Sequence, residues 1–349
     1  MNTASFLENA SRTEILEVSG PGGIPFARII EADRPVIVRG VGRQWPIVKA
    51  GLDGPDAAMD YLAQFYSGRP LVLYTLAPEA EGQPFYDETV TAMNFQRSQV
   101  SLEAFFSAVR QTFGQPNPPG YYVQSTDQML FFPGFEAENG IDLAPLAPFA
   151  KAPPVVSLWL GGKTTARAHY DMSNNIAVCL AGRRRFILFP PDQVHNLYPG
   201  PLAPTPGGQV ISMVDIHNPD LDAHPKFEEA AQAAQIADLE PGDLLMYPAL
   251  WWHQVEAREP FNILLNYWWN AVPSYADSPM NTLLHGLLSL RDRPASEKAA
   301  WREMFDYYVF GDAGQAGAHL PGAARGPLGE IDEMMARRLR AEVLRKLNR

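Results

Sequence analysis

Residues 155–180 read VVSLWLGGKTTARAHYDMSNNIAVCL, and this stretch decides the fold. Two apolar runs, residues 155–160 and 176–180, have the composition of β-strands and flank His169 and Asp171. Side chains two residues apart on a strand point to the same face of its sheet. The imidazole of His169 and the carboxylate of Asp171 are therefore expected to lie together on one face.

A second histidine, His253, is the distant partner of this pair. It follows the turn-like residues 240–243 and the apolar pair Trp251-Trp252. Two imidazoles and one carboxylate are the ligand set of non-haem Fe(II) oxygenases. A hydrogen-bonded His–Asp pair with one separate core histidine is the alternative interpretation. Polar residues on the surrounding apolar strands favour a binding site, because buried polar groups need partners. These residues are Asn174, Asn175, Arg184, Asn262 and Asn266.

Further motifs follow in a fixed order. They are Ala168-His169-Tyr170-Asp171, residues 182–193 (GRRRFILFPPDQ), Leu197-Tyr198-Pro199, Asn218-Pro219-Asp220, Pro241-Gly242-Asp243, Trp251-Trp252-His253 and Asn266-Tyr267-Trp268. Their order over residues 120–270 resembles the JmjC/cupin-like family of Fe(II)/2-oxoglutarate-dependent oxygenases, and within it the asparaginyl hydroxylase that inhibits hypoxia-inducible factor. The resemblance implies a double-stranded β-helix (a jelly roll, or cupin core) with the triad at one mouth of the barrel.

The resemblance also implies a reaction. His169, Asp171 and His253 would bind Fe(II), and 2-oxoglutarate would be the cosubstrate. The products would be succinate, CO2 and a hydroxylated protein side chain or small molecule, with Gln124 at the position of a substrate-contacting glutamine. Two alternatives stay open. One is a non-oxygenase cupin that binds a metal or small ligand without 2-oxoglutarate, and the other is an interaction protein whose triad is empty.

Four residues are implied to bind the cosubstrate. Tyr122 and Arg184 match positions that hold its distal carboxylate, and Asn175 and Asn266 match amides near its 1-carboxylate. The family has lysine where this chain has Arg184, although arginine can also bind a carboxylate in bidentate fashion. The family also has a threonine at the position of Ala166, and Thr164 or Thr165 is an alternative source of its hydroxyl group. These two differences are the main reason to question the use of 2-oxoglutarate.

Composition excludes some classes of partner. The net charge is −11, which argues against bulk attraction to nucleic acid or to an anionic membrane. The single cysteine, Cys179, cannot form an intrachain disulfide and suits a reducing cytoplasm. Residues 1–7 show no signal-peptide pattern, and no apolar run reaches the roughly 18 residues of a membrane span.

The whole chain is predicted to be mainly β with helices. Residues 1–276 would form the oxygenase domain, with mixed α/β elements before a jelly-roll core at about 120–270. Within that core, the composition of residues 225–237 favours a helix. In the first 124 residues we expect strands at 35–39, 71–75 and 121–124, helices at 57–65 and 101–109, and a loop at 76–95.

Residues 277–349 are predicted to be helical. Apolar residues at helical spacing mark residues 280–290, 297–310 and 330–347, with a Gly/Ala/Pro-rich segment at 311–329. The last helix could pack on its own domain with a solvated basic face. The resemblance instead implies a homodimer through the C-terminal helices.

Overall fold

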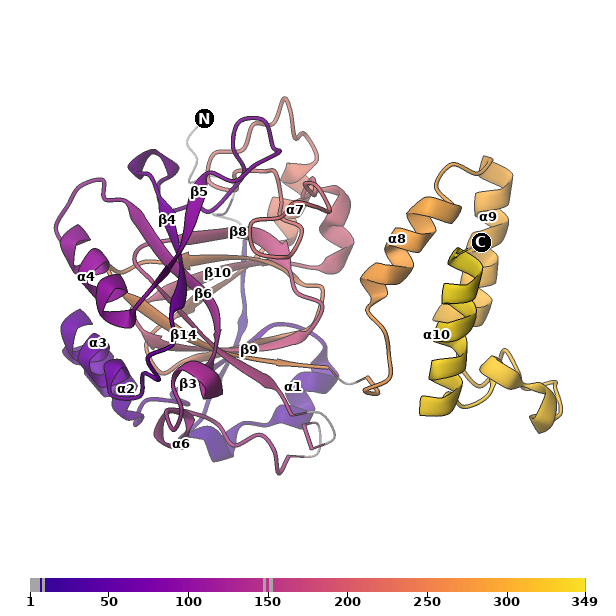
Figure 1. Ribbon diagram of the computed structural model, residues 1–349, viewed down its shortest axis with the longest axis horizontal. Helices are drawn as coiled ribbons and strands as arrows, with labels where there is room; N and C mark the ends of the chain where they lie inside the picture. Colours follow the sequence, from indigo (N-terminus) through magenta and orange to yellow (C-terminus); the bar gives the residue numbers. More distant parts are fainter. Residues whose placement is uncertain (1–6, 8–9, 147–148, 151–152, 271, 349) are drawn as a thin grey trace. The chain divides into compact units, whose positions relative to one another are not determined.

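The computed structural model describes residues 7, 10–146, 149–150, 153–270 and 272–348 (Figure 1). The chain divides into two compact units, residues 1–270 and 271–349. No helix in the described ranges is long and apolar enough to cross a membrane.

Short strands and helices precede the barrel. They are β1 (Ser11–Arg12), β2 (Glu14–Glu17), α1 (Phe26–Ala32), β3 (Val36–Arg39), α2 (Pro46–Asp53), α3 (Pro55–Ala63), β4 (Leu71–Leu76), β5 (Phe95–Val100), α4 (Leu102–Thr112), β6 (Gly120–Asp127), α5 (Gln128–Phe131) and α6 (Glu136–Asn139). The predicted strands and helices of this region are confirmed. Ser101 caps α4, because its hydroxyl group accepts a hydrogen bond from the Ala104 N–H at 3.2 Å.

The barrel strands follow the predicted all-β region. They are β7 (Val155–Gly161), β8 (Thr165–Tyr170), β9 (Asn174–Ala181), β10 (Arg184–Phe189), β11 (Gln235–Leu239), β12 (Leu244–Tyr247), β13 (Trp252–Ala257) and β14 (Asn262–Trp269), with α7 (Phe227–Ala233) before β11. One sheet has the order β1-β11-β10-β13-β8, and the other has the order β2-β3-β12-β9-β14-β7-β6-β4-β5. The predicted β-rich jelly-roll core is therefore confirmed.

The helix predicted at residues 225–237 is only partly correct. The helix α7 ends at Ala233, and Gln235 begins β11, which pairs antiparallel with β10 and parallel with β1. Alanine-rich composition favours a helix locally, but Ile236 and Leu239 are buried in the sheet. Tertiary packing thus overrides propensity over the last residues of the segment.

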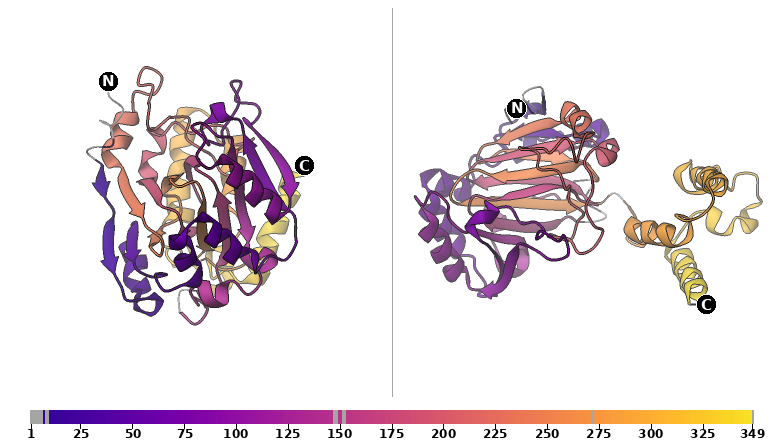
Figure 2. Two further views of the ribbon diagram at one scale, coloured as in Figure 1. Left: turned by 90° about the vertical axis from the view of Figure 1, so that its left-hand side faces the viewer. Right: turned by 90° about the horizontal axis from the view of Figure 1, so that it is seen from above.

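The alternation of side chains creates two different faces on the large sheet. Its outer face, including Val178 and Leu265, packs against Met59 and Phe105 of the N-terminal helices. Figures 1 and 2 show α2, α3 and α4 together on this flank of the barrel. The inner face meets the smaller sheet in a second apolar cluster that includes Ala177, Cys179, Leu264, Phe186 and Leu188. Polar residues that share this inner face consequently point into the barrel.

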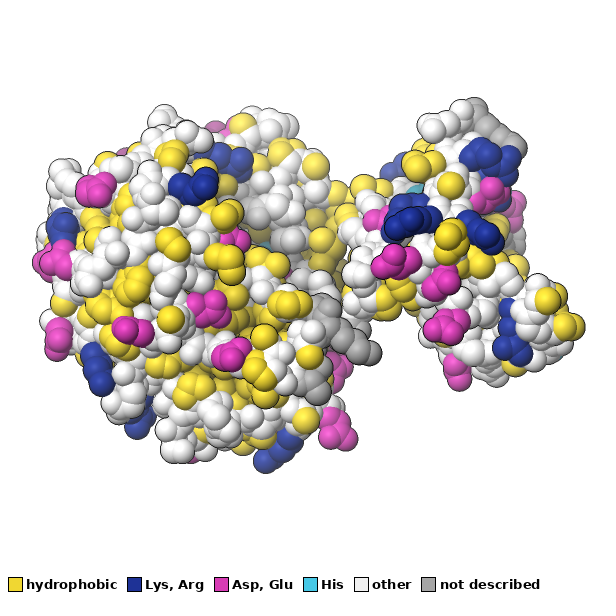
Figure 3. Space-filling view, turned by 60° about the horizontal axis from the view of Figure 1, so that its bottom comes forward, with side chains coloured by type: hydrophobic (Ala, Val, Ile, Leu, Met, Phe, Trp, Pro, Cys, Tyr) yellow, Lys and Arg dark blue, Asp and Glu magenta, His cyan; other side chains and the backbone are white. Residues whose placement is uncertain are grey.

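The second unit is helical, as predicted. It contains α8 (Pro279–Ser289), α9 (Ala295–Phe305), a π-helical turn (Asp306–Phe310) and α10 (Glu333–Leu347). The Asp332 carboxylate caps α10 by accepting the Met335 N–H at 2.7 Å. Among its described apolar residues, only Ala316 and Ala336 are buried. Apolar side chains lie between basic and acidic ones on the face drawn in Figure 3.

Candidate metal centre

The structure brings the three predicted metal ligands together. His169 lies near the end of β8, Asp171 follows that strand directly, and His253 lies on β13. His169 and His253 are register partners across the two antiparallel strands, and their ring centroids are 4.2 Å apart. One ligand atom from each residue lies within 4.8 Å of the others. The pairing register therefore positions two imidazoles and one carboxylate around one point.

Backbone carbonyl groups orient both imidazoles. Nδ1 of His169 lies 2.8 Å from the carbonyl oxygen of Arg167, and Nδ1 of His253 lies 2.9 Å from that of Trp251. A carbonyl oxygen only accepts, so the proton of each neutral ring is on Nδ1. The Nε2 lone pair is then free to bind a metal, which is the usual arrangement of metal-ligating histidines. The pKa of His253 lies well below its usual range, mainly because the ring is buried and secondarily because His169 is close to it. This lowered pKa favours the neutral form of His253.

The carboxylate ligand has a partner that the sequence analysis missed. The indole Nε1–H of Trp268 donates to Oδ2 of Asp171 at 3.1 Å. Trp268 also packs edge-on against Trp159, with ring centroids 5.7 Å apart. Tyr267 and Trp269 pack in the outer core. Trp268 shares the inner face of β14 with Asn266, two residues before it. This spacing is the sequence signal that indicates an inward-pointing Trp268 side chain.

The predicted amides also lie inside the barrel, beside the triad. Nδ2 of Asn266 donates to Oδ1 of Asn175 at 3.3 Å, and Nδ2 of Asn175 donates to the carbonyl oxygen of Ser173 at 2.9 Å. Tyr247, the register partner of Asn175 on β12, places its ring 4.8 Å from that of His253. Sequence reasoning did not identify this tyrosine.

Arg184 is a buried cation without a counter-ion among the described residues. Its side chain points inward and the residue is 4% exposed, whereas Arg183 and Arg185 point outward. Arg183 pairs with Glu259 at 2.6 Å and Arg185 pairs with Asp238 at 2.6 Å. Arg184 makes no ion pair or hydrogen bond with the residues that the structure describes, and its buried Nε has no partner. Burial accordingly lowers the pKa of Arg184, because the charged form is poorly solvated.

The remaining predicted residues, Tyr122 and Gln124, lie two residues apart on β6. Tyr122 is buried, and burial raises the pKa of its hydroxyl group, although the charge of Arg184 partly offsets that rise. Gln124 is half-buried, and a loop that includes Gly207 passes close to its amide. The structure therefore places Tyr122 next to Arg184 and Gln124 next to a surface loop.

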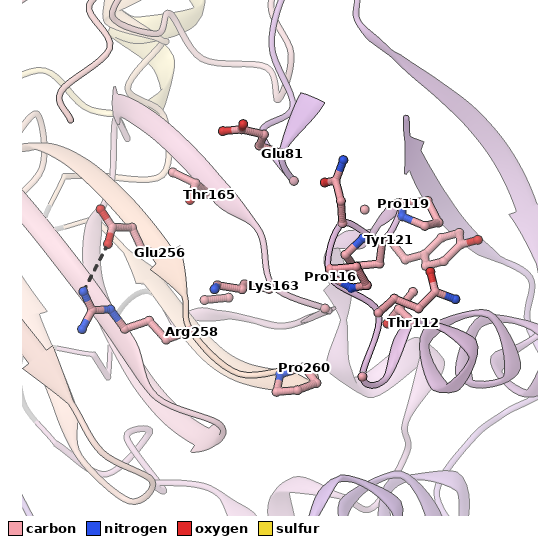
Figure 4. Close-up of a pocket in the computed structure, with 18 of the residues that line it drawn as sticks. Glu81, Thr112, Pro116, Pro119, Tyr121, Lys163, Thr165, Glu256, Arg258 and Pro260 are labelled. Carbon is pink, nitrogen blue, oxygen red and sulfur yellow. Dashed lines mark ion pairs between the residues drawn. The ribbon is translucent and has the colours of Figure 1, made fainter. Parts of the chain in front are cut away.

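A separate cleft of about 750 Å³ lies at the surface (Figure 4). Its charged lining includes Glu81, Lys163, Glu256 and Arg258, and Nε2 of His217 lies 2.5 Å from the Glu256 carboxylate. Of the described residues that line it, none belongs to the triad or to the predicted cosubstrate site. The cleft is thus distinct from the metal centre.

The donor set inside the barrel fits a specific combination of ligands. Two imidazoles and one carboxylate suit Fe(II) and leave metal positions open for other ligands. The unpaired guanidinium of Arg184 fits an anionic group deeper in the barrel, because a buried cation needs compensation. Together these residues can hold a metal and a small anionic ligand inside the barrel.

Three relatives illustrate what the chain is similar to. The lysine-specific demethylase JMJ31 of Arabidopsis thaliana is 29% identical over 135 residues, which are 37% of this chain and 24% of that protein. The HSPB1-associated protein 1 of Homo sapiens is 36% identical over 115 residues, 32% of this chain and 23% of that protein. The tRNA wybutosine-synthesizing protein 5 of Danio rerio is 33% identical over 126 residues, 36% of this chain and 33% of that protein.

The matched part of the chain thus spans only about a quarter to a third of the length of these relatives. The family profile described as "Cupin-like domain" matches much more of the chain, residues 24–275. That range includes the triad and all the barrel strands. Because it also covers well over half of the 349 residues, the chain belongs to the cupin-like, JmjC-type domain family.

Proposed function

We propose that the protein is an Fe(II)- and 2-oxoglutarate-dependent dioxygenase that hydroxylates a protein side chain or a small molecule and releases succinate and CO2. The observation that carries this proposal is the unpaired guanidinium of Arg184 inside the barrel that also contains the triad. A metal site alone is compatible with many cupins. A buried cation inside the same barrel, with no counter-ion among the described residues, calls for an anionic ligand.

Each residue has a role in this proposal. His169, Asp171 and His253 hold Fe(II), which when bound with 2-oxoglutarate supplies the oxidising chemistry. Arg184 is four residues from Leu188, the β10 partner of His253, so its backbone lies roughly 13 Å deeper along the barrel. A five-carbon dicarboxylate and the long arginine side chain together can bridge this distance.

The other polar residues complete the cosubstrate site. We assign Tyr122 to the distal carboxylate, beside Arg184, and Asn175 and Asn266 to the 1-carboxylate, beside the metal. Asn266 and Asn175 hold each other in place through their amide hydrogen bond. Gln124 is assigned to the prime substrate because it lies on the same strand as Tyr122, two residues away, and next to a loop.

The class of prime substrate stays open between protein and small molecule. One relative is named as a lysine-specific demethylase and another as a tRNA wybutosine-synthesizing protein. The net charge of −11 gives no support to an RNA substrate. The likeness to an asparaginyl hydroxylase rests on the sequence motifs alone. We also propose a cytoplasmic location, because the single cysteine is buried and unpaired.

The second candidate is a cupin that binds a metal or small ligand without using 2-oxoglutarate. Two residues favour it, because Arg184 is larger than the lysine that the resemblance implies and Ala166 lacks the hydroxyl group of the corresponding threonine. In this case Arg184 would bind a different anion.

Anaerobic titration of 2-oxoglutarate into Fe(II)-loaded protein separates the two candidates. We expect the visible charge-transfer band of a chelated 2-oxo acid in the wild type. Arg184→Ala should abolish it at the same concentration, whereas Arg183→Ala, a matched change to a solvated arginine, should keep it. Fe(II) binding without the band in the wild type would favour the second candidate.

We further propose a homodimer through the C-terminal helices. The unit buries almost none of its own apolar surface, and several large side chains on its helices are exposed. They include Leu283, Leu284, Leu288, Trp301, Met304, Val343, Leu344 and Leu347. So much exposed apolar surface on one helical unit is typical of an association surface. A second copy of the chain would provide matching helices to cover it.

Light scattering after gel filtration tests the dimer. We expect twice the chain mass of 38.6 kDa for the wild type. The double variant Leu344→Glu/Leu347→Glu should lower the mass to that of one chain. Leu52→Glu, at an exposed leucine of the first unit, is the control and should remain dimeric. A wild type that runs as one chain at micromolar concentration would contradict this proposal.

A further inference from the structure

Two buried N–H groups inside the barrel have no acceptor. They are Nε1 of Trp159 and Nε of Arg184, and neither atom has a hydrogen-bond partner among the described residues. Trp269 also has an unpaired indole N–H, but it lies on the opposite face of β14, where its ring packs edge-on against Phe149 at 5.1 Å. Buried donors are nearly always paired, so each of these atoms requires an explanation.

Trp159 and Arg184 belong to the same layer of the barrel. Trp159 is the register partner of Leu264, and Leu264 is the partner of Cys179, so one row of inner side chains crosses β7, β14 and β9. Arg184, from the facing sheet, acts electrostatically on both Cys179 and Tyr122. The ring of Tyr122 is stacked on Trp159 with centroids 6.1 Å apart. Tyr122 is therefore in ring contact with Trp159 and is also affected by the charge of Arg184.

This arrangement lacks an acceptor rather than a donor. The indole N–H of Trp159 and the guanidinium of Arg184 have no acceptor among the described residues, the phenol of Tyr122 stacks on Trp159, and a carboxylate can accept several hydrogen bonds. The resemblance places a threonine hydroxyl at Ala166, and alanine cannot donate. An indole N–H can supply the missing hydrogen bond.

We propose that Trp159 donates a hydrogen bond to the distal carboxylate of 2-oxoglutarate, beside Arg184 and Tyr122, and thereby selects 2-oxo acids that carry a second carboxylate. This inference rests on the proposed function. It assigns Trp159 a polar role at a position where an apolar strand residue would normally only pack.

Two neighbouring aromatic rings pack against the indole of Trp159. Trp159 is stacked on Tyr122 on one side, and its ring meets that of Trp268 edge-on, with centroids 5.7 Å apart. Trp268 in turn donates to Asp171. A rigid donor loses little conformational entropy on binding, so its hydrogen bond contributes to affinity and selectivity.

The test compares two variants and two ligands. Trp159→Phe keeps an aromatic ring beside Tyr122 but removes the N–H, and Trp269→Phe removes an equally unpaired N–H from the outer core. Each Fe(II)-loaded protein is titrated anaerobically with 2-oxoglutarate and with 2-oxopentanoate, which lacks the distal carboxylate. Thermal melting checks that both variants are folded.

For Trp159→Phe we expect the Kd of 2-oxoglutarate to rise about tenfold to a hundredfold, as for loss of a hydrogen bond to a charged group. Its Kd for 2-oxopentanoate should stay within about twofold of the wild type. Trp269→Phe should change neither value. If Trp159→Phe raises the Kd of both 2-oxo acids equally, or raises neither, the inference is overturned. The charge-transfer band of the wild type would still support the proposed function in that case.

A measurement on the wild type covers the case in which Trp159→Phe does not fold. The chain has seven tryptophans, and their indole N–H signals can be followed by NMR in zinc-loaded, ¹⁵N-indole-labelled protein. Addition of 2-oxoglutarate should shift the Trp159 signal downfield, and 2-oxopentanoate should not. The signal is assigned by elimination with single Phe variants of the other tryptophans. An unmoved Trp159 signal at saturating 2-oxoglutarate would overturn the inference, and wild-type protein that binds no 2-oxoglutarate would overturn both proposals.

Discussion

Replacing Arg184 by methionine should stabilise the protein when no anion is bound. Methionine fills a similar length of the barrel but carries no charge, and Arg184 has neither an ion pair nor a hydrogen bond with the described residues. Replacement of buried charged groups by well-packed apolar ones is often stabilising by about 1–4 kcal/mol. A gain of about 2 kcal/mol would raise the melting temperature of a unit of this size by about 4–8 °C.

Addition of 2-oxoglutarate should reverse the order of stability. A ligand at a hundred times its Kd stabilises the folded state by about 2.7 kcal/mol. The metal-loaded wild type should therefore melt at a higher temperature with 2-oxoglutarate, and Arg184→Met should show no shift. The assay is thermal melting by circular dichroism, with and without the ligand.

The control for this experiment is Arg185→Met. Arg185 pairs with Asp238 at the surface, so its loss should destabilise the protein by about 1 kcal/mol or less and leave the 2-oxoglutarate shift intact. If Arg184→Met melts at or below the wild-type temperature without ligand, then Arg184 is stabilised within the fold and the argument from an uncompensated charge is refuted.

Three further changes have defined outcomes. Trp268→Phe removes the hydrogen bond to Asp171 and should weaken metal binding about tenfold, measured by competition with a chelator; unchanged affinity would mean that the bond does not orient this ligand. His253→Ala should abolish the rise in melting temperature that metal gives the wild type, and the wild type should lose the same rise when metal is removed by EDTA. The hydrogen bond with Glu256 raises the pKa of His217 in the folded protein. The stabilisation that protonated His217 gives is therefore fully present below the pKa of this histidine in the unfolded chain. It is lost as the pH rises through the pKa of His217 in the folded protein. Burial alone would raise the pKa of Glu256, but its hydrogen bond with His217 lowers it, which keeps the carboxylate charged at mildly acidic pH. His217→Gln should thus lower the melting temperature by about 1–3 °C near pH 5.5 and by almost nothing at pH 9, and a deficit that is the same at both values would contradict this assignment.

The strands and the pairing of His169 with Asp171 were predictable because both follow from side-chain alternation, whereas the inclusion of His253 in the candidate triad also relied on the family resemblance. The spacing of His169 and Asp171 needs only a strand end, and the inward direction of Arg184 follows from its position between two solvated arginines. Strand β11 was harder, because the alanines before it favour a helix and only its pairing with β10 makes it a strand.

The hydrogen-bond partners inside the barrel could not be predicted in the same way. The contact from Trp268 to Asp171 joins residues 97 positions apart, and nothing in local sequence reports it. The unpaired state of Trp159 is also a property of the packed structure, since it depends on which acceptors fail to reach the indole. Alternation predicts the direction of a side chain, and the packed structure is needed to find its partner.

The position of β8 at the end of its sheet has a consequence for the persistence of the folded barrel. β8 is the last strand in the order β1-β11-β10-β13-β8, and its one full strand neighbour is β13. Two of the candidate metal ligands lie at the end of β8 and the third lies on β13. A bound ion would therefore link an edge strand to its neighbour. Without this link, β8 is held by β13 and by one isolated bridge from His169 to Ile211, and we expect an edge strand with so few partners to open and to be cleaved by proteases more readily. The supply of metal would then set the lifetime of the protein as well as its activity.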